Sequence, residues 1–351
     1  MSSNANRWYA SRENVKRALG IEGAQFDALI DGYIESASAQ IEQLINRRFI
    51  PLTAEKEYSW PQRDNRKGWV LYLEEDLLAV TALTRTGDDE VAIASTDYFL
   101  EPSVLGPPYW RIELDLASTA YFDSKDTHQR AMRVTGRWGY SEDTKAAGAL
   151  AEADDGSETA LDVTDASLID VGDTIKIGTE AMFVSAKAPL DTTANTAGAL
   201  VASKAEVTVP VNTGSLVKAG EVILIDSERM LVESVSGNNL TVIRAYDGST
   251  LATHANPSDV YAYRTLTVVR GVNGTTAASH SLSDAITKYA PPGDIVNLCR
   301  AMAIAEHVNS RGGWTGAIGA GEAAVESRGF NLREMRDRVV RTYRRRSVGA
   351  V

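Results

Sequence analysis

Between residues 26 and 44, apolar residues recur at steps of three and four, the period of an α-helix. They form one apolar stripe along about six turns, opposite a polar and acidic face. The stripe consists of Phe26, Ile30, Ile34, Ala37, Ile41 and Leu44. A shorter helix is predicted over residues 9–20, because Ser11 suits the N-cap and Gly20 suits the left-handed turn that ends a helix. The pattern therefore predicts two consecutive helices, of which the second ends before Pro51.

Between residues 57 and 140 the period changes to two, which is the period of a β-strand. Turn residues, such as those at 87–89 and 106–108, separate the strand-like pieces. These pieces cover residues 70–73, 80–85, 98–100, 111–114 and 132–140. The pattern predicts a small antiparallel sheet that completes the first part of the fold, residues 1–145.

A repeated β region follows residues 146–159, which are rich in Ala, Gly, Asp and Glu and are interpreted as a linker. The stretch at 240–254 recurs 26 residues later at 266–280. A second match, 168–184 against 216–232, has an offset of 48 residues. A tandem array would show one period for every match, so these unequal offsets exclude it.

The front halves of the two copies, 168–184 and 216–232, are thus followed by their back halves, 240–254 and 266–280. Two arrangements fit this order. Either the second copy is inserted whole into the first, or the two copies exchange strands. We favour nesting, because the run at 189–203 has the composition of an exposed loop, where a chain tolerates an inserted domain. The outer β module then comprises residues 160–206 and 264–289, and the nested β module comprises residues 207–263. Nesting requires residues 187 and 264 to lie close together.

Helical spacing returns after residue 292, with Asp294 placed to cap the new helix. A glycine-rich run at 312–321 precedes a last helix that contains Leu332, Met335 and Val339. Residues 290–351 are therefore C-terminal helices with a basic tail. The predicted fold class is α+β: a helical core with a small antiparallel sheet, plus an all-β insertion of two similar modules, one nested in the other.

The chain has 351 residues, a hydrophobic content of 44% and a net charge of −11. This length predicts two or three domains, and the apolar content excludes wholesale disorder. We expect no membrane segment, because the apolar runs fall short of the roughly 18 residues that span a bilayer. The negative charge argues against binding nucleic acid over the whole surface. The charge is uneven, since residues 151–191 carry ten acids and two lysines, whereas residues 328–346 carry eight arginines and two acids.

Candidate catalytic or metal-binding residues are scarce. His254 and His280 are equivalent in the two copies, but neither has a second donor at the spacing of a metal site, so hydrogen bonds within the turn explain them better. The glycine-rich run lacks the Lys-Ser or Lys-Thr of a phosphate-binding loop and continues into Glu322. Cys299 lies in an apolar run and is expected to be buried. We therefore expect no catalytic residue, no metal and no cofactor.

The basic tail contains Tyr343, Arg344, Arg345 and Arg346 and allows three interpretations. The first is the solvated end of a helix, where arginines suit the helix dipole. The second is docking on an acidic protein surface through bidentate carboxylate pairs. The third is contact with a nucleic acid backbone.

Outside the β repeat, the order of short motifs resembles the head-tail adaptor (connector) family of long-tailed bacteriophages. The motifs are Tyr-Ala-Ser-Arg-Glu-Asn-Val at 9–15, Ile-Glu-Ser-Ala-Ser-Ala-Gln-Ile-Glu at 34–42, Asn-Arg-Arg-Phe-Ile-Pro at 46–51, Tyr-Phe-Leu at 98–100, Gly-Arg-Trp-Gly-Tyr at 136–140, Trp314, and Tyr-Arg-Arg at 343–345. The resemblance covers residues 8–145 and 288–346. The repeated β region is similar to small β modules inserted into phage structural proteins.

The resemblance implies a structural head-to-tail adaptor without enzymatic activity, made in the host cytoplasm and built into the neck of the virion. It implies a homo-oligomeric ring of twelve copies under the portal protein, joined to a downstream neck or tail-completion protein. Genomic DNA would pass through the ring without sequence-specific binding, and the β modules would project outward. The residues carried over are Tyr343, Arg344, Arg345 and Arg346 as a portal contact, and Arg47 and Arg48 as a neighbour-subunit contact.

A second hypothesis is a virion or cell-surface binding protein whose β modules recognise a host glycan or a neighbouring protein. Glycan sites usually stack sugars on exposed Trp or Tyr side chains. Residues 150–262 contain no tryptophan and only Tyr246 and Tyr261, which argues against a glycan.

Overall fold

The structure, a computed structural model, describes residues 6–62, 67–86, 90–124, 127–312 and 322–345. These residues form four α-helices and two antiparallel sheets, so the fold is α+β and mostly β. The chain divides into two compact units, and each is described by itself. Unit 1 contains Met1–Ala39, Thr144–Val272 and Thr276–Arg333. Unit 2 contains Gln40–Asp143, Asn273–Thr275 and Glu334–Val351.

The helices are α1 (Arg12–Leu19), α2 (Asp27–Ile45), α3 (Gly293–Gly312) and α4 (Glu322–Tyr343). The predicted caps of the first helix are confirmed: the Ser11 hydroxyl accepts the N–H of Asn14 at 3.3 Å, and Gly20 has a φ of 63°. Residues 313–321 of the predicted glycine-rich connection lie outside the described residues. Among the helices that the structure describes, none is both long and apolar enough to cross a membrane.

The sheet of unit 2 has the strand order β1-β6-β2-β5-β4, with β3 beside β2. Its strands are β1 (Leu52–Tyr58), β2 (Val70–Arg85), β3 (Val91–Ile93), β4 (Tyr98–Glu101), β5 (Tyr109–Leu114) and β6 (Met132–Trp138). The pieces predicted at 70–73 and 80–85 are one strand. A shift of register against β5, between Tyr72 and Leu77, accommodates the acidic run between them without the chain leaving the sheet.

Inward-facing residues of these strands form the core of unit 2. Leu71, Leu77, Ile112, Val134 and Trp138 are fully buried. In β6, buried and partly exposed residues alternate along the whole strand, as the period of two predicted. The indole N–H of Trp138 donates to the carbonyl oxygen of Ala54 at 3.0 Å, so this large side chain is buried with its polar atom satisfied.

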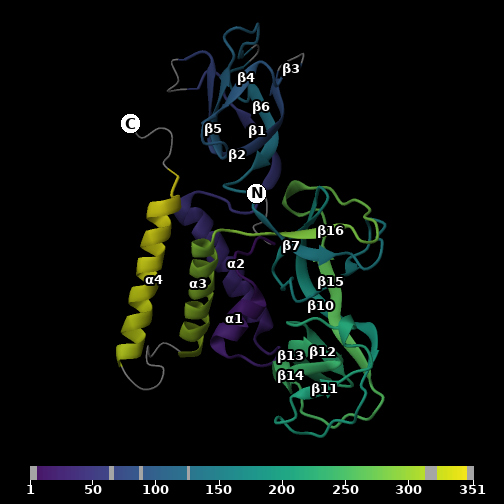
Figure 1. Cartoon of the computed structure of the whole chain (residues 1–351). Helices are drawn as coiled ribbons and strands as arrows, with labels where there is room; N and C mark the ends of the chain where they lie inside the picture. The colour runs from purple at the N-terminus through teal and green to yellow at the C-terminus, as the bar shows by residue number, and fades with distance from the viewer. Residues whose placement is uncertain (1–5, 63–66, 87–89, 125–126, 313–321, 346–351) are drawn as a thin grey trace. The chain divides into compact units, whose positions relative to one another are not determined.

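The sheet of unit 1 has the order β11-β14-β13-β12-β15-β10-β9-β16-β7, with β8 beside β15. Its strands are β7 (Thr144–Ala149), β8 (Ala160–Asp162), β9 (Thr174–Ile177), β10 (Glu180–Asn195), β11 (Thr208–Pro210), β12 (Val222–Ile225), β13 (Glu228–Ser236), β14 (Asn239–Ile243), β15 (Asp259–Val269) and β16 (Ala285–Tyr289). The short 3-10 turns are η1 (Gly214–Leu216), η2 (Tyr246–Gly248) and η3 (Val272–Gly274). The long strands β10 and β15 pair with each other and run through the whole region (Figure 1).

Two separate apolar cores lie along this sheet. The first contains Ile175, Met182 and Leu266, and the second contains the equivalent residues of the repeat, Ile223, Met230 and Leu240. Each core combines one front half with one back half. The repeat seen in the sequence therefore corresponds to two complete packing units.

The structure corrects two predictions about this region. Within the predicted linker at 146–159, strand β7 pairs with β16, and Leu150 bridges Val163. Within the predicted loop at 189–203, strand β10 continues to Asn195, and Thr196 bridges Val211. These two bridges are equivalent, since Val163 and Val211 are related by the offset of 48 residues. Each copy thus begins with a strand of small and polar residues. Because these residues show no clear alternation of apolar and polar positions, the strand is not recognisable in the sequence.

Nesting requires that residues 187 and 264 lie close together. Lys187 pairs with Leu266 and Ala188 pairs with Thr265 in the β10–β15 ladder, so the two positions are neighbours. Ala194 and Leu200, which the predicted boundary placed in the outer module, pack in the second core. The nested arrangement stays a hypothesis, with residues 144–187 and 264–289 as its outer module and residues 188–263 as its nested module.

Within unit 1, the N-terminal segment contacts both β modules. The Trp8 ring meets the Phe183 ring edge-on, with ring centroids 5.1 Å apart. The Glu13 carboxylate accepts the N–H of Val171 at 2.9 Å. The Lys16 ammonium lies 2.8 Å from the Asp247 carboxylate in η2 of the second module. Helix α1 is therefore attached to the β region by packing, a hydrogen bond and an ion pair.

Candidate functional site

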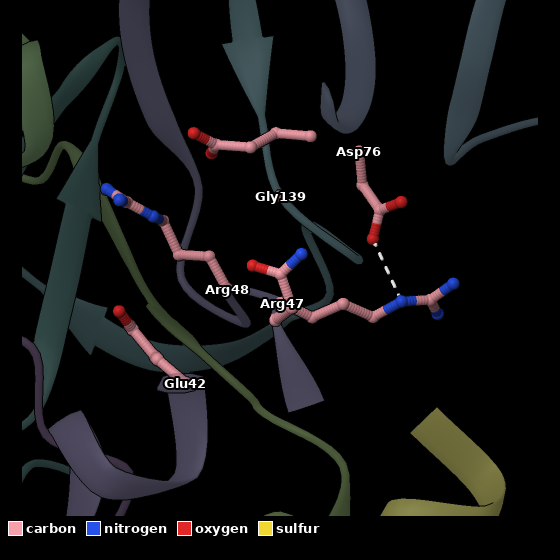
Figure 2. A pocket seen from close by; sticks show the side chains of 7 residues that line it. Glu42, Arg47, Arg48, Asp76 and Gly139 are labelled. Atoms are coloured by element: carbon pink, nitrogen blue, oxygen red, sulfur yellow. Dashed lines mark ion pairs between the residues drawn. The ribbon is translucent and has the colours of Figure 1, made fainter. Parts of the chain in front are cut away.

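A pocket of about 140 Å³ lies in unit 2, where the end of α2 meets the bend in β2 (Figure 2). Helix α2 ends at Ile45, and Asn46 then takes a left-handed conformation with a φ of 52°, which asparagine tolerates better than most residues. This turn directs the two arginines that follow it to the pocket. The residues that line the pocket are Glu42, Asn46, Arg47, Arg48, Glu75, Asp76 and Gly139.

Arg47 and Asp76 form the ion pair drawn in Figure 2, with Nε 3.1 Å from the carboxylate. The Arg47 guanidinium also lies over the Tyr140 ring, 4.9 Å from its centroid. Asp76 is buried, with 6% of its side chain exposed. Burial raises the pKa of Asp76, although Arg47 and Arg345 oppose the shift. Arg47 is therefore held by two contacts inside its own unit.

The predicted tail residues Arg345 and Tyr343 reach the same place. The backbone N–H of Arg345 donates to the carbonyl oxygen of Ile45 at 3.0 Å, and its Nη2 donates to the carbonyl oxygen of Leu73 at 2.8 Å. The Arg345 Nε lies 3.5 Å from Asp76. Burial lowers the pKa of the Arg345 guanidinium, with the nearby Asp76 opposing the shift. Arg345 thus connects α2, β2 and the end of α4.

Three aromatic rings pack beside this arginine. Tyr343 meets Phe49 edge-on at a centroid distance of 5.6 Å and Tyr140 at 5.5 Å. Phe49 and Tyr140 are themselves 5.4 Å apart. The cluster joins the last residue of α4, the turn after α2 and the second residue after β6, so Tyr343 packs within its unit.

Arg344 and Arg48 differ from these packed residues. Arg344 is exposed, and Arg346 lies outside the described residues. Arg48 lines the pocket, and its Nη1 is buried without a hydrogen-bond partner among the described residues. The structure therefore brings Arg47, Arg48, Tyr343 and Arg345 together, and it assigns packing contacts to three of them.

Asp76 and Tyr140 are members of this site that the sequence pattern did not predict. A signal for Asp76 existed, because the run of acids at 74–76 interrupts an otherwise apolar strand. A carboxylate inside a strand of this kind needs a buried cation nearby. The sequence does not indicate which cation this is, because Arg345 lies far from Asp76 along the chain.

The two equivalent histidines have partners that differ from the prediction. His254 Nε2 lies 2.9 Å from Glu228, and His280 Nε2 lies 3.0 Å from Glu180. Each glutamate belongs to the front half of its module, so the histidine bonds across the module and not within its own turn. The described residues contain no group of three His, Cys, Asp or Glu side chains that could hold a metal ion.

An arginine completes each of these two clusters. Arg244 contacts Glu228 through two hydrogen bonds of 2.8 Å, and Arg270 contacts Glu180 at 2.7 and 3.1 Å. Burial raises the pKa of Glu180, but the hydrogen bonds from Arg270, the Ala278 N–H and His280 outweigh it and lower the pKa to about 2. In each cluster the glutamate accepts hydrogen bonds from the arginine and contacts the histidine. The repeated His and Arg are therefore explained as structural residues of the module.

The predicted burial of Cys299 is confirmed. The side chain is fully buried, and its sulfur lies 3.3 Å from the Ser38 hydroxyl. Burial raises the pKa of the thiol to about 11, which leaves it an inert packing residue.

Comparison with known proteins identifies the class to which the first part of the chain is similar. Residues 10–70 match the family model described as phage gp6-like head-tail connector protein. This segment contains α1, α2 and β1, together with the pocket residues Glu42, Asn46, Arg47 and Arg48. The match confirms the resemblance to head-tail connectors over this segment.

Two other comparisons add little. No curated protein matches the sequence. A solved chain from the neck of an empty GTA particle computed with C6 symmetry is 20% identical, covers 40% of this chain and 69% of its own, and has a TM-score of 0.26. So low an overall similarity carries no argument about fold or function.

Proposed function

We propose that this protein is a structural head-to-tail connector of a tailed bacteriophage, in which it forms a ring under the portal and joins the capsid to the tail. The observation that carries the proposal is the match of residues 10–70 to the head-tail connector family, which supports a role in the virion neck. A role in assembly, and not in catalysis, accounts for a pocket whose charged groups are mainly engaged with one another.

The charge of the chain supports a conduit for DNA. A ring wall that gripped phosphates through many arginines would slow the passage of the genome, because each contact releases counterions and gains affinity. A net charge of −11 favours sliding over binding. In this proposal the DNA contacts the ring without sequence-specific recognition.

The proposed contact residues now separate into two groups. Arg344 is exposed and is the described part of the tail available to a portal protein. Arg346 lies outside the described residues and stays a proposed portal contact. Arg345 and Tyr343 hold that segment in place from inside unit 2. In the same way, Arg47 supports the turn on which Arg48 faces the pocket, so Arg48 is the better candidate for contact with a neighbouring subunit.

Electron microscopy of the purified protein, alone and mixed with its portal protein, tests the proposal. We expect rings that dock on the portal, with twelve copies as the number that the resemblance implies. A protein that stays monomeric at high concentration and ignores the portal would overturn the proposal. The variant Arg344→Glu should weaken docking while leaving the ring intact.

A further inference from the structure

The charged groups that line the pocket nearly all have partners. Asp76 is shared by Arg47 and Arg345, and Glu75 is paired with Lys56. Glu42 also has a partner. Arg48 remains: among the described residues, none accepts a hydrogen bond from its buried Nη1 or forms an ion pair with it. A buried donor without an acceptor is costly, which indicates that an acceptor arrives from outside the unit.

The surroundings of Arg48 favour an anion. The Arg345 guanidinium also has a buried Nη1 without a hydrogen-bond partner in the described part of the chain. Burial lowers the pKa of Lys56, and the nearby charges of Arg48 and Arg345 lower it further, although Glu75 opposes them. A carboxylate placed against Arg48 would satisfy its guanidinium and reduce this mutual repulsion.

The chain offers acids that lack cations. In the loop after β7, Glu152, Asp155 and Glu158 are exposed, and none forms an ion pair among the described residues. The charge of Asp162 raises the pKa of Glu152, and partial burial and the charge of Glu158 raise it further. Glu152 and Glu158 repel each other, so a cation brought near the loop would be attracted to it.

The second copy of the module provides an internal control for this loop. Asp154 bridges His280 in one module, and Leu200 bridges His254 at the equivalent place in the other. The residues that follow are Asp-Gly-Ser-Glu at 155–158 in one module and Val-Ala-Ser-Lys at 201–204 in the other. Because the same bridge forms with and without these acids, the fold of the module does not require Asp155 or Glu158.

We propose that the acidic loop of one copy, residues 152–158, docks on the Arg48 pocket of the next copy in the ring. The charge complementarity of the two surfaces selects a second copy of this chain as the occupant. The contact is head-to-tail, since loop and pocket are different surfaces, and such contacts form a ring when the rotation between neighbouring copies closes. This inference rests on the proposed function and gives the β insertion a role as a clamp between subunits.

Charge reversal tests the contact. Arg48→Glu reverses the pocket, and Glu152→Lys with Glu158→Lys reverses the loop; Lys204 occupies the position equivalent to Glu158, so a lysine is compatible with the fold there. Each variant alone should raise the concentration needed for ring assembly by roughly tenfold to a hundredfold, as native mass spectrometry would measure. The matched control, Glu22→Lys with Glu233→Lys, changes the same charge at exposed positions elsewhere and should assemble normally.

Mixing the two variants gives the decisive result. The acidic pocket of one variant meets the basic loop of the other, and the remaining pockets and loops keep their native charges, so alternating rings should form. A chain that carries all three substitutions should also assemble. Recovery in that chain without recovery in the mixture would mean that loop and pocket pair within one chain, and would overturn the proposal.

The outcomes also separate this inference from the proposed function. If the unaltered protein forms no ring, the proposed function fails. If rings form and none of the reversals affects them, the connector role stands and the clamp is wrong. If Arg48→Glu fails to fold, as circular dichroism would show, Arg48→Gln and the loop variant still test the contact.

Discussion

The backbone N–H of Arg345 donates to the carbonyl oxygen of Ile45 at 3.0 Å, although 300 residues separate them in the sequence. Ile45 is the last residue of α2, where the helix leaves carbonyl oxygens without partners. The chain just beyond α4 supplies the missing donor. This bond fixes the segment that carries Arg344 to the turn that carries Arg48, so the two surfaces proposed for contact belong to one compact unit.

Removing the Arg345 side chain should therefore destabilise unit 2. Arg345→Met leaves the carbonyl oxygen of Leu73 without its donor and Asp76 with one cation instead of two. We expect the free energy of unfolding to fall by roughly 3 kcal/mol, the scale for breaking a buried ion pair. Denaturant unfolding would measure it. The exposed neighbour provides the control, since Arg344→Met should change stability by less than about 0.5 kcal/mol.

The glutamates of the repeated clusters should make stability depend on acid. The pKa of Glu180 falls from an ordinary 4.5 to about 2 in the folded protein. Its contribution is thus complete above pH 4.5 and is lost as the pH falls through about 2. Glu180→Gln should cost about 3 kcal/mol at neutral pH and less below pH 4.5, in unfolding curves taken across this range. A constant difference between variant and parent would contradict the assignment, and Glu233→Gln, at an exposed position, is the control.

Two glycines with similar φ angles allow the cost of backbone strain to be distinguished from the cost of a steric contact. Gly237 and Gly248 have φ values of 59° and 71°. A Cβ at Gly237 would meet nothing within 4 Å, whereas a Cβ at Gly248 would lie 2.7 Å from the Cα of Gly23. Gly237→Ala should cost about 1 kcal/mol from the left-handed backbone alone. Gly248→Ala should cost at least about 1 kcal/mol more, because η2 must move away from the chain at Gly23. Equal losses in thermal unfolding would show that this approach contributes nothing.

His307 should weaken the helices of unit 1 in mild acid. Its ring lies edge-on to Phe26 and Tyr33, with centroids at 5.3 and 6.2 Å, and neither nitrogen has a hydrogen-bond partner among the described residues. Burial, followed by the charge of Arg311, lowers the pKa of His307 below 6.5. The neutral ring therefore stabilises the fold above pH 6.5, and this stability is lost as the pH falls through the lowered pKa.

The variant His307→Leu removes this titration. Its stability relative to the parent protein should rise steadily as the pH is lowered from 6.5, measured by unfolding at several pH values. His128→Gln, at an exposed histidine, is the control variant. A His307→Leu profile parallel to that of the parent would contradict the prediction.

Periodicity located the elements whose burial is regular. The apolar stripe from Phe26 to Leu44 predicted α2, and the capping residues Ser11 and Gly20 predicted the bounds of α1. These features depend on neighbours three or four residues apart, so the sequence contains all the information that they need. Strand β7 and the second half of β10 were missed, because small and polar residues fill them and their pairing partners lie far along the chain.

By itself, the sequence determined the mixed fold class and the repeat within the β region, and it pointed to Tyr343 and the arginines at 47, 48 and 344–346 as candidate contact residues. It did not determine which of those arginines face outward. Tertiary structure decided that Arg345 is buried against Asp76 and that Arg48 keeps an unmatched donor. The physical reason is that a charge is matched by whatever the fold brings within a few ångströms of it. Asp76 and Arg345 meet only because α4 ends beside the end of α2 in unit 2.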